Sequence, residues 1–258
     1  MKIAVTGKGG VGKTTFAAIL SRLYADDGYK VMAVDVDPDA NLGLGLGFPE
    51  SLLKEITPIS EMKDLIQERT NSKPGTYSTM FKLNPKVDDI PDQYSVQYYG
   101  VKLLTMGTVD TGGSGCFCAQ NTLVKRLMSH LILENEDVVI MDMEAGLEHI
   151  GRGTAENVDV FFVVVEPGIR SIQTFHQVKK LAEDIGVANV YVVGNKVKND
   201  ADKEFIESHA GECLGFMSYL EEIKESDRYG SSPYDLCKKT VEEVAEVRRR
   251  FVQQTKSS

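Results

Sequence analysis

A glycine-rich segment near the amino terminus constrains this chain more than any other feature of its sequence. Residues 7–15 read Gly-Lys-Gly-Gly-Val-Gly-Lys-Thr-Thr and fit the pattern G-x-x-x-x-G-K-[ST]. The segment follows an apolar run, Lys2–Thr6, and opens a helical pattern, Lys13–Asp27. A strand, a glycine loop and a helix in this order form a phosphate-binding loop, because the loop amides and the helix amino end point at one anion. The chain is therefore expected to bind a nucleotide.

The residues of this loop have separate expected roles. The glycines let the main chain fold around phosphate oxygens with its N–H groups pointing inward. Lys13 is expected to contact the β- and γ-phosphates and so to act in catalysis, and the Thr14 hydroxyl is expected to bind Mg²⁺. The residues expected to hold ATP or ADP in this loop are Gly9, Gly10, Val11, Gly12, Lys13, Thr14 and Thr15.

Short apolar runs alternate with longer helical patterns along the chain. The runs are almost wholly apolar, which is typical of strands buried on both faces of a parallel sheet. This pattern predicts an α/β fold, a doubly wound and mostly parallel sheet flanked by helices, with ligands at the carboxyl edge of the strands. The expected strands are Lys2–Thr6, Val31–Asp35, Val101–Thr105, Val138–Asp142, Val160–Val165 and Val190–Gly194, and the expected helices include Lys13–Asp27, Gln120–Glu134, Ser171–Ile185 and Thr240–Gln253.

The length and polarity of the chain predict its domain organisation. The 258 residues suit one P-loop domain, residues 1–258. The stretch from about 48 to 100 is polar, contains Pro74, Pro85 and Pro91, and breaks the alternation of strands and helices. We expect it to be an irregular insertion with partial structure, a subdomain or interface arm rather than a linker.

Charge and hydropathy argue against two classes of partner. The formal net charge of -9 gives no overall attraction to nucleic-acid phosphates. No apolar run approaches the ~20 residues of a membrane span, and the chain starts directly with an expected strand rather than a signal peptide. We therefore expect a cytoplasmic protein that binds neither nucleic acid nor membrane.

Acidic residues follow two of the expected strands. Asp35 ends the second strand, and Asp37 follows it at a place where a carboxylate can orient water and bind the outer shell of magnesium. Asp142 ends the strand that starts at Val138, the arrangement in which a carboxylate holds Mg²⁺ through water. Asp37 is thus a candidate catalytic residue, and Thr14, Asp37 and Asp142 are candidate magnesium ligands, directly or through water.

Asn195 and Lys196 follow the strand that starts at Val190. A guanine-reading N-K-x-D signature would need an aspartate at position 198, where this chain has Lys198. The sequence therefore favours ATP over GTP.

Two of the four cysteines form a second motif, Gly112-Gly113-Ser114-Gly115-Cys116-Phe117-Cys118. Two thiols one residue apart can point at one ion where glycines let the backbone turn. Two thiolates do not complete a tetrahedral site, but Cys116 and Cys118 from both subunits of a symmetric dimer supply four sulfurs. Thiolates suit Zn²⁺, Ni²⁺ or Cu⁺. Cys213, in an expected strand, and Cys237, near a helix start, are interpreted as core thiols.

The loop sequence K-G-G-V-G-K-T, residues 8–14, resembles that of the deviant Walker A family. That family includes the MinD and ParA partition ATPases, the nitrogenase iron protein and ATPases that mature metal centres. Its first lysine reaches across a dimer to the partner's nucleotide, so the resemblance implies a catalytic role for Lys8 in a nucleotide-sandwich homodimer. It also implies that Asp37 lies beside the attacking water and that Asn195 pairs with the adenine edge.

A narrower resemblance combines four stretches of the chain. The segments K-G-G-V-G-K-T, D-V-D-P-D-A-N-L, G-G-S-G-C-F-C and D-M-E-A-G-L-E-H-I-G-R-G-T together resemble the CooC family, the nickel-insertion ATPases that mature carbon monoxide dehydrogenase. This resemblance implies a homodimer that binds Ni²⁺ or Zn²⁺ through Cys116 and Cys118. It implies slow ATP hydrolysis coupled to loading nickel into the Ni–Fe–S cluster of a partner, the carbon monoxide dehydrogenase apo-enzyme.

Two other functions share the phosphate loop. A partition or cell-division ATPase of the MinD/ParA type would act on membrane or DNA. An iron–sulfur electron donor like the nitrogenase iron protein would take its cysteines from two separate switch regions, and the stretch from Asp142 to Thr154 contains no cysteine. Both remain alternatives to the nickel ATPase.

Overall fold

The computed structural model describes residues 1–37, 39–72, 81–107, 118–133, 137–144, 158–187 and 189–257. Its central element is an eight-stranded sheet in the order β3-β4-β2-β5-β1-β6-β7-β8. Among the described strands, β3 alone runs antiparallel, against β4, and every other neighbouring pair is parallel. The predicted α/β fold is confirmed. The strands are β1 Lys2–Thr6, β2 Val31–Asp35, β3 Val96–Tyr98, β4 Val101–Thr105, β5 Val138–Asp142, β6 Val160–Val165, β7 Val190–Val197 and β8 Cys213–Ser218.

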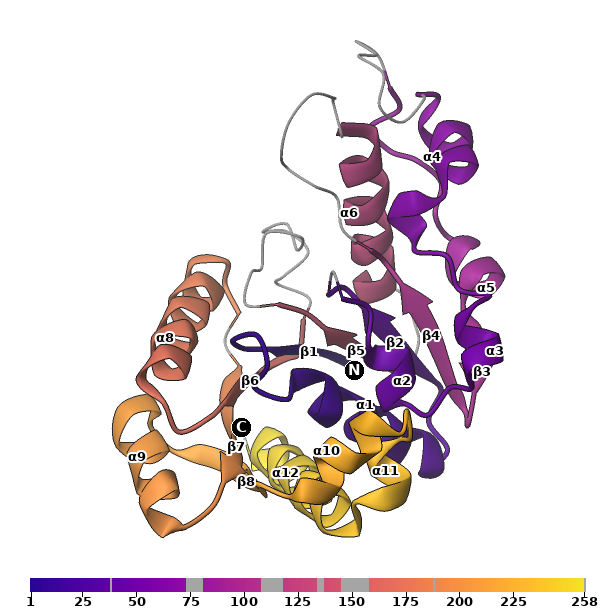
Figure 1. Ribbon diagram of the computed structural model, residues 1–258. Helices are drawn as coiled ribbons and strands as arrows, with labels where there is room; N and C mark the ends of the chain where they lie inside the picture. The colour runs from indigo at the N-terminus through magenta and orange to yellow at the C-terminus, as the bar shows by residue number, and fades with distance from the viewer. Residues whose placement is uncertain are drawn as a thin grey trace.

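Helices cover both faces of this sheet (Figure 1). One face packs against α1 and α12, while the other packs against α6 near β5 and against α8 and α9 near β7. The helices are α1 Lys13–Asp26, α2 Leu42–Gly45, α3 Glu50–Leu53, α4 Lys63–Thr70, α5 Ile90–Tyr94, α6 Cys118–Leu133, α8 Ile169–Asp184, α9 Asp200–Ala210, α10 Glu221–Arg228, α11 Pro233–Leu236 and α12 Lys238–Ser257, with a 3-10 turn at Ile59–Glu61.

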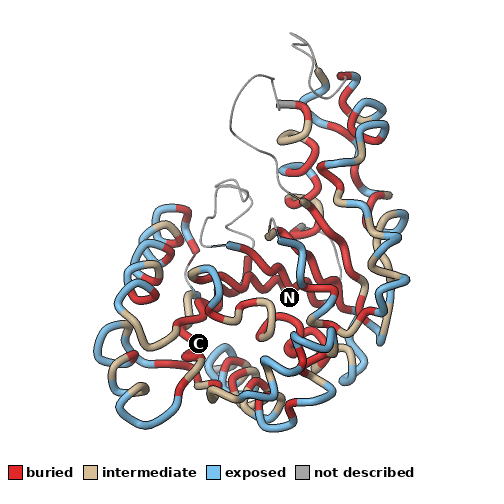
Figure 2. The backbone as a smooth tube through the Cα atoms, in the orientation of Figure 1, coloured by how far each residue is buried: buried red, intermediate tan, exposed pale blue. Residues whose placement is uncertain are grey.

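The two layers of core are set by the two-residue repeat of the strands. Successive side chains of a strand point to opposite faces, so Phe161 joins the core under α6 and Phe162 joins the core under α1 and α12. The Phe162 ring meets those of Phe16 and Phe251 edge to face, at centroid distances of 5.4 and 5.3 Å. Figure 2 shows the central strands as a continuous buried block between partly exposed helices. Burial on both faces explains why the strands read as unbroken apolar runs.

The region from 48 to 100 contains more regular structure than its sequence indicated. Its described part includes α3, the 3-10 turn, α4, α5 and β3. Ile66 and Ile90 are fully buried in the core that also contains α6. Arg69 of α4 donates to both carboxylate oxygens of Asp89, at 2.8 and 2.7 Å, and these bonds lower the pKa of Asp89 to about 2. The region thus packs on the main core, and β3 extends the main sheet.

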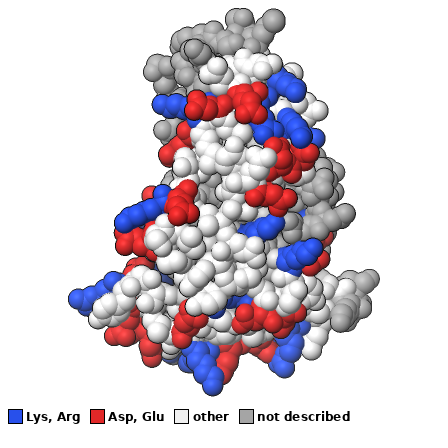
Figure 3. All heavy atoms as spheres, turned by 90° about the vertical axis from the view of Figure 1, so that its right-hand side faces the viewer, with Lys and Arg blue, Asp and Glu red and all other residues white. Residues whose placement is uncertain are grey.

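The outer surface shows mixed charge. On the face shown in Figure 3, the described lysines and arginines are interspersed with aspartates and glutamates around an uncharged area. Among the described residues, no helix combines the length and apolar character that crossing a membrane requires.

Candidate nucleotide site

A cavity of about 470 Å³ opens at the carboxyl ends of the parallel strands. The phosphate loop forms one side of it, and Asp37, Glu144 and Asn195 reach it from the ends of β2, β5 and β7. The segment after β8 forms the far side. The fold therefore brings the expected loop residues, Asp37 and Asn195 into one site at the predicted sheet edge.

The loop glycines adopt backbone conformations that side chains disfavour. Gly7, Gly10 and Gly12 have φ values of 146°, 77° and 97°. Gly12 directly precedes α1, and a Cβ atom placed on it would lie 2.2 Å from the Asn195 amide nitrogen. The loop thus needs glycine at position 12 both for its left-handed φ and for the close approach of β7.

Thr14, which lines the cavity, contacts Asp142, which is buried behind it. The Thr14 hydroxyl donates to Asp142 Oδ2 at 2.6 Å, while Asp142 Oδ1 is buried and has no hydrogen-bond partner within the described part of the chain. Burial raises the pKa of Asp142 to about 6 even though Thr14 and Lys13 lower it. A buried carboxylate oxygen without a donor, beside a hydroxyl, fits the oxygen ligands that Mg²⁺ prefers. Thr14 and Asp142 would hold the ion, with Asp37 reached through water, and a bound ion would neutralise phosphate charge.

Asp35 organises the loop that carries Asp37. Its carboxylate oxygens accept from the backbone N–H groups of Asp37 at 3.2 Å and Leu42 at 2.9 Å. Asp37 Oδ2 lies 3.9 Å from Lys13 Nζ, and Lys13 is almost fully buried. The sequence indicated Asp35 only as an acidic residue at the second strand, whereas in the structure it is the acceptor that shapes this loop.

We expect the unfolding free energy of the nucleotide-free protein to fall as the pH rises from 3.8 to about 7. Burial, and next the charge of Asp142, raise the pKa of Asp35 from 3.8 to about 7. The unfolded chain keeps the ordinary value, so between the two values the folded state binds more protons and loses stability as pH climbs. Thermal unfolding at several pH values measures this slope. The Asp35→Asn variant should make the slope shallower but not abolish it, because the raised pKa of Asp142 acts in the same direction. An unchanged slope in the variant would rule Asp35 out as a contributor.

Asn195 secures the phosphate loop from β7. Its amide nitrogen donates to the Val11 carbonyl at 2.7 Å, and its amide oxygen accepts from the Lys196 N–H at 2.7 Å. Asn195 is buried. The next residue, Lys196, has a left-handed φ of 57°. Contact between Asn195 and the adenine edge stays a prediction.

Sequence reasoning missed the far wall of the cavity. Ser218, Tyr219, Leu220 and Ile223 line it, from the end of β8 into α10. Glu243 of α12 fixes this segment by accepting from the Ser218 N–H at 2.8 Å and the Ser218 hydroxyl at 2.6 Å. No motif marks these residues. The only available signal was that the apolar run from Cys213 ends at the same sheet edge as the phosphate loop.

The cysteine motif is placed only in part. Cys116 lies outside the described residues, and for Cys118 the structure describes only the main chain, as the first residue of α6. Cys213 and Cys237 are buried, and neither forms a disulfide within the described part of the chain, as expected for core thiols. Burial raises the pKa of Cys213 to about 12. Among the residues that the structure describes, no three His, Cys, Asp or Glu side chains are grouped to hold a metal ion.

The arrangement suits transfer of a phosphoryl group to water. The backbone amides of the loop, the amino end of α1 and the Lys13 ammonium group lie where phosphates would bind, and Asp37 carries a carboxylate into the same cavity. This fold and site define a P-loop ATPase.

Comparison with known proteins assigns the family. The model of the CobQ/CobB/MinD/ParA nucleotide binding domain matches residues 2–234, and the chain belongs to this family. It is 47% identical over 238 residues to the carbon monoxide dehydrogenase accessory protein CooC of Rhodospirillum rubrum, covering 92% of this chain and 90% of that protein. It is 46% identical over 251 residues to an ATP-binding protein of Methanocaldococcus jannaschii, covering 96% of each.

Solved structures agree on the fold. The MinC:MinD cell division protein complex of Aquifex aeolicus contains a chain that superposes with a TM-score of 0.67. The alignment covers 98% of this chain and 96% of that one, at 21% identity. At this identity the similarity concerns the fold alone.

Proposed function

We propose that this ATPase is a nickel-insertion factor for carbon monoxide dehydrogenase, working as a homodimer in the cytoplasm. The observation that carries the proposal is the similarity to CooC along nearly the whole chain. The Cys116-Phe117-Cys118 motif gives the ATPase a soft-metal ligand pair. Two copies of the motif would complete a four-sulfur site for Ni²⁺ or Zn²⁺ at the subunit interface.

A chain of hydrogen bonds offers a route between the nucleotide and this motif. The Met106 N–H donates to the Asp35 carbonyl at 2.8 Å, and the Met106 carbonyl accepts from the Ser60 N–H at 3.0 Å. The Ser60 carbonyl accepts from the Gln120 side-chain amide at 3.0 Å. Gln120 is in the first turn of α6, which begins at Cys118. In the proposed cycle, a shift of the loop that Asp35 holds is passed to the start of α6 through these bonded groups, and this links the nucleotide to the metal site.

The proposed ATPase cycle uses Lys8 of each subunit at the partner's nucleotide. A cation supplied by the second subunit would stabilise the charge that spreads over the phosphate oxygens during transfer, as an arginine finger does. Hydrolysis would then accompany opening and closing of the dimer and hence of the shared metal site. Lys13 and Asp37 act within the subunit in this proposal.

Anaerobic nickel titration of the purified protein, with and without ADP, tests the proposal. We expect one Ni²⁺ per dimer, as measured by metal content, absorbance and sedimentation. Binding should be lost in Cys116→Ser and in Cys118→Ser. Cys213→Ser is the matched control, because the Cys213 thiol is buried in β8 and its raised pKa keeps it protonated. That variant should bind nickel like the wild type.

Two results would replace the proposal with another function. Tight binding to DNA or liposomes without a thiol-dependent metal site would favour a partition ATPase. A brown protein with an iron–sulfur absorbance spectrum would favour an electron donor. Nickel binding that survives both cysteine substitutions would place the metal elsewhere in the chain.

A further inference from the structure

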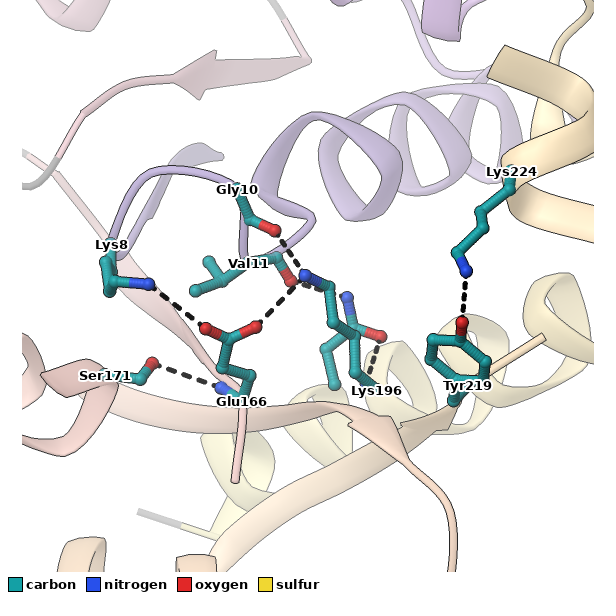
Figure 4. A network of polar contacts seen from close by, with 9 residues as sticks. Lys8, Gly10, Val11, Glu166, Ser171, Lys196, Tyr219 and Lys224 are labelled. Carbon is teal, nitrogen blue, oxygen red and sulfur yellow. Dashed lines mark hydrogen bonds and ion pairs between the residues drawn. The ribbon is translucent and has the colours of Figure 1, made fainter. Parts of the chain in front are cut away.

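One carboxylate joins two lysines at the back of the phosphate loop (Figure 4). Glu166 Oε1 lies 3.2 Å from Lys8 Nζ, and Glu166 Oε2 lies 3.0 Å from Lys196 Nζ. Lys196 Nζ also donates to the Gly10 carbonyl at 2.6 Å. The loop that carries Lys8 is thus tied to β6 and β7 by one shared acceptor.

Glu166 is held independently of the phosphate loop. It directly follows β6, and its N–H donates to the hydroxyl of Ser171, which is buried in the first turn of α8. Burial raises the pKa of Glu166, but hydrogen bonds from Lys196 and Lys8 outweigh burial and bring the pKa below its ordinary value. The main chain of Glu166 is therefore anchored to α8, and its side chain is a carboxylate at neutral pH, paired with Lys8 and Lys196.

The arrangement allows Lys8 to leave at low cost. The Lys8 and Glu166 side chains are 36% and 25% exposed, and ion pairs this accessible to water are weak. When Lys8 leaves, Lys196 still neutralises Glu166, so no unpaired charge is left partly buried. The ion pair between Lys8 and Glu166 can therefore break while Glu166 keeps Lys196 as its partner.

We propose that Glu166 is a positioning residue that holds Lys8 within its own subunit until a partner's nucleotide competes for the ammonium group. This inference rests on the proposed function for the second half, the transfer of Lys8 to a partner. The first half concerns one subunit and is testable without a dimer. Phosphate oxygens outcompete Glu166 because they offer several charge-assisted hydrogen bonds where the carboxylate offers one.

The first test measures how fast an amine-acylating reagent modifies Lys8 in the nucleotide-free protein, by peptide mass spectrometry. Glu166→Gln keeps the size of the side chain and removes its charge, so Lys8 should react about two- to fivefold faster, the range expected for a partly exposed ion pair. The Lys196→Met variant distinguishes direct restraint of Lys8 by Glu166 from a general loosening of the phosphate loop. It removes the tie to Gly10 but keeps Glu166, so Lys8 should react no faster than in the wild type. Equal rates in Glu166→Gln and wild type, or equal acceleration in both variants, would overturn the proposal.

The second test measures association by sedimentation with a non-hydrolysable ATP analogue. Glu166→Gln should associate about two- to fivefold more tightly than the wild type, because Lys8 no longer has to break an ion pair first. The double variant Lys8→Ala with Glu166→Gln should associate no more tightly than Lys8→Ala alone. A wild type that associates while Glu166→Gln associates no better would overturn the proposal. A wild type that never associates would contradict the dimer of the proposed function, and the acylation rates would then decide alone whether Glu166 holds Lys8.

Discussion

Asp142→Asn should slow ATP hydrolysis by about 10²- to 10³-fold, the usual cost of removing one preorganised electrostatic group from a site. Asp142 ends β5 beneath the phosphate loop, accepts the Thr14 hydroxyl through Oδ2 and keeps Oδ1 buried without a partner among the described residues. Asparagine has nearly the same shape but no charge, and one of its two terminal atoms is a donor. The change therefore removes the best candidate ligand for Mg²⁺ while leaving the packing of β5 intact.

Steady-state hydrolysis over a range of Mg²⁺ concentrations measures this effect, with thermal unfolding as a check on the fold. Asp137→Asn is the matched control. Asp137 lies just before β5 at the opposite edge of the sheet, is exposed, and accepts from the Lys30 N–H at 3.1 Å. That variant should hydrolyse ATP like the wild type. Equal rates for the two variants would show that Asp142 has no role in the reaction.

The parts of the site that lie next to strong local patterns could be predicted from the sequence. The phosphate loop combines glycines with a lysine and a threonine whose spacing has few other uses. Asp37 follows one apolar strand and Asp142 ends another, and parallel strands bring such residues to one edge of the sheet. Local order along the chain was therefore sufficient to predict that Asp37 lies near Lys13 and that Asp142 lies near Thr14.

Contacts between distant segments could not be predicted in the same way. Glu166 meets Lys8 across 158 positions of sequence, and its place depends on β6 lying beside β1 and on the Ser171 hydrogen bond. β3 is three residues long and half-exposed, too short for an alternating pattern to emerge. The far wall of the cavity depends on Glu243 reaching Ser218 from α12, a contact that neither residue indicates by itself.

Gly12→Ala should lower ATP affinity at least about tenfold and destabilise the protein by about 1–3 kcal/mol, the usual range for one residue held in a strained backbone region. Position 12 has a φ of 97°, and the new Cβ would lie 2.2 Å from the Asn195 amide nitrogen. Relief of that overlap requires the loop to move away from β7, or Asn195 to give up its hydrogen bond to Val11. Either movement displaces the amides expected to face the phosphates, so affinity falls together with stability.

Gly28→Ala separates the two causes. Gly28 has a similar φ of 85°, but no described atom outside its chain neighbours lies within 4 Å of the place that a Cβ would take, so the variant carries the backbone strain without the collision. It should lose about 1–2 kcal/mol of stability, the cost of a left-handed residue, and bind ATP like the wild type. Calorimetric titration with ATP and thermal unfolding of both variants measure the difference. If Gly12→Ala binds ATP as tightly as Gly28→Ala, the loop has room for a side chain at position 12, and the close approach of Asn195 does not shape the phosphate site.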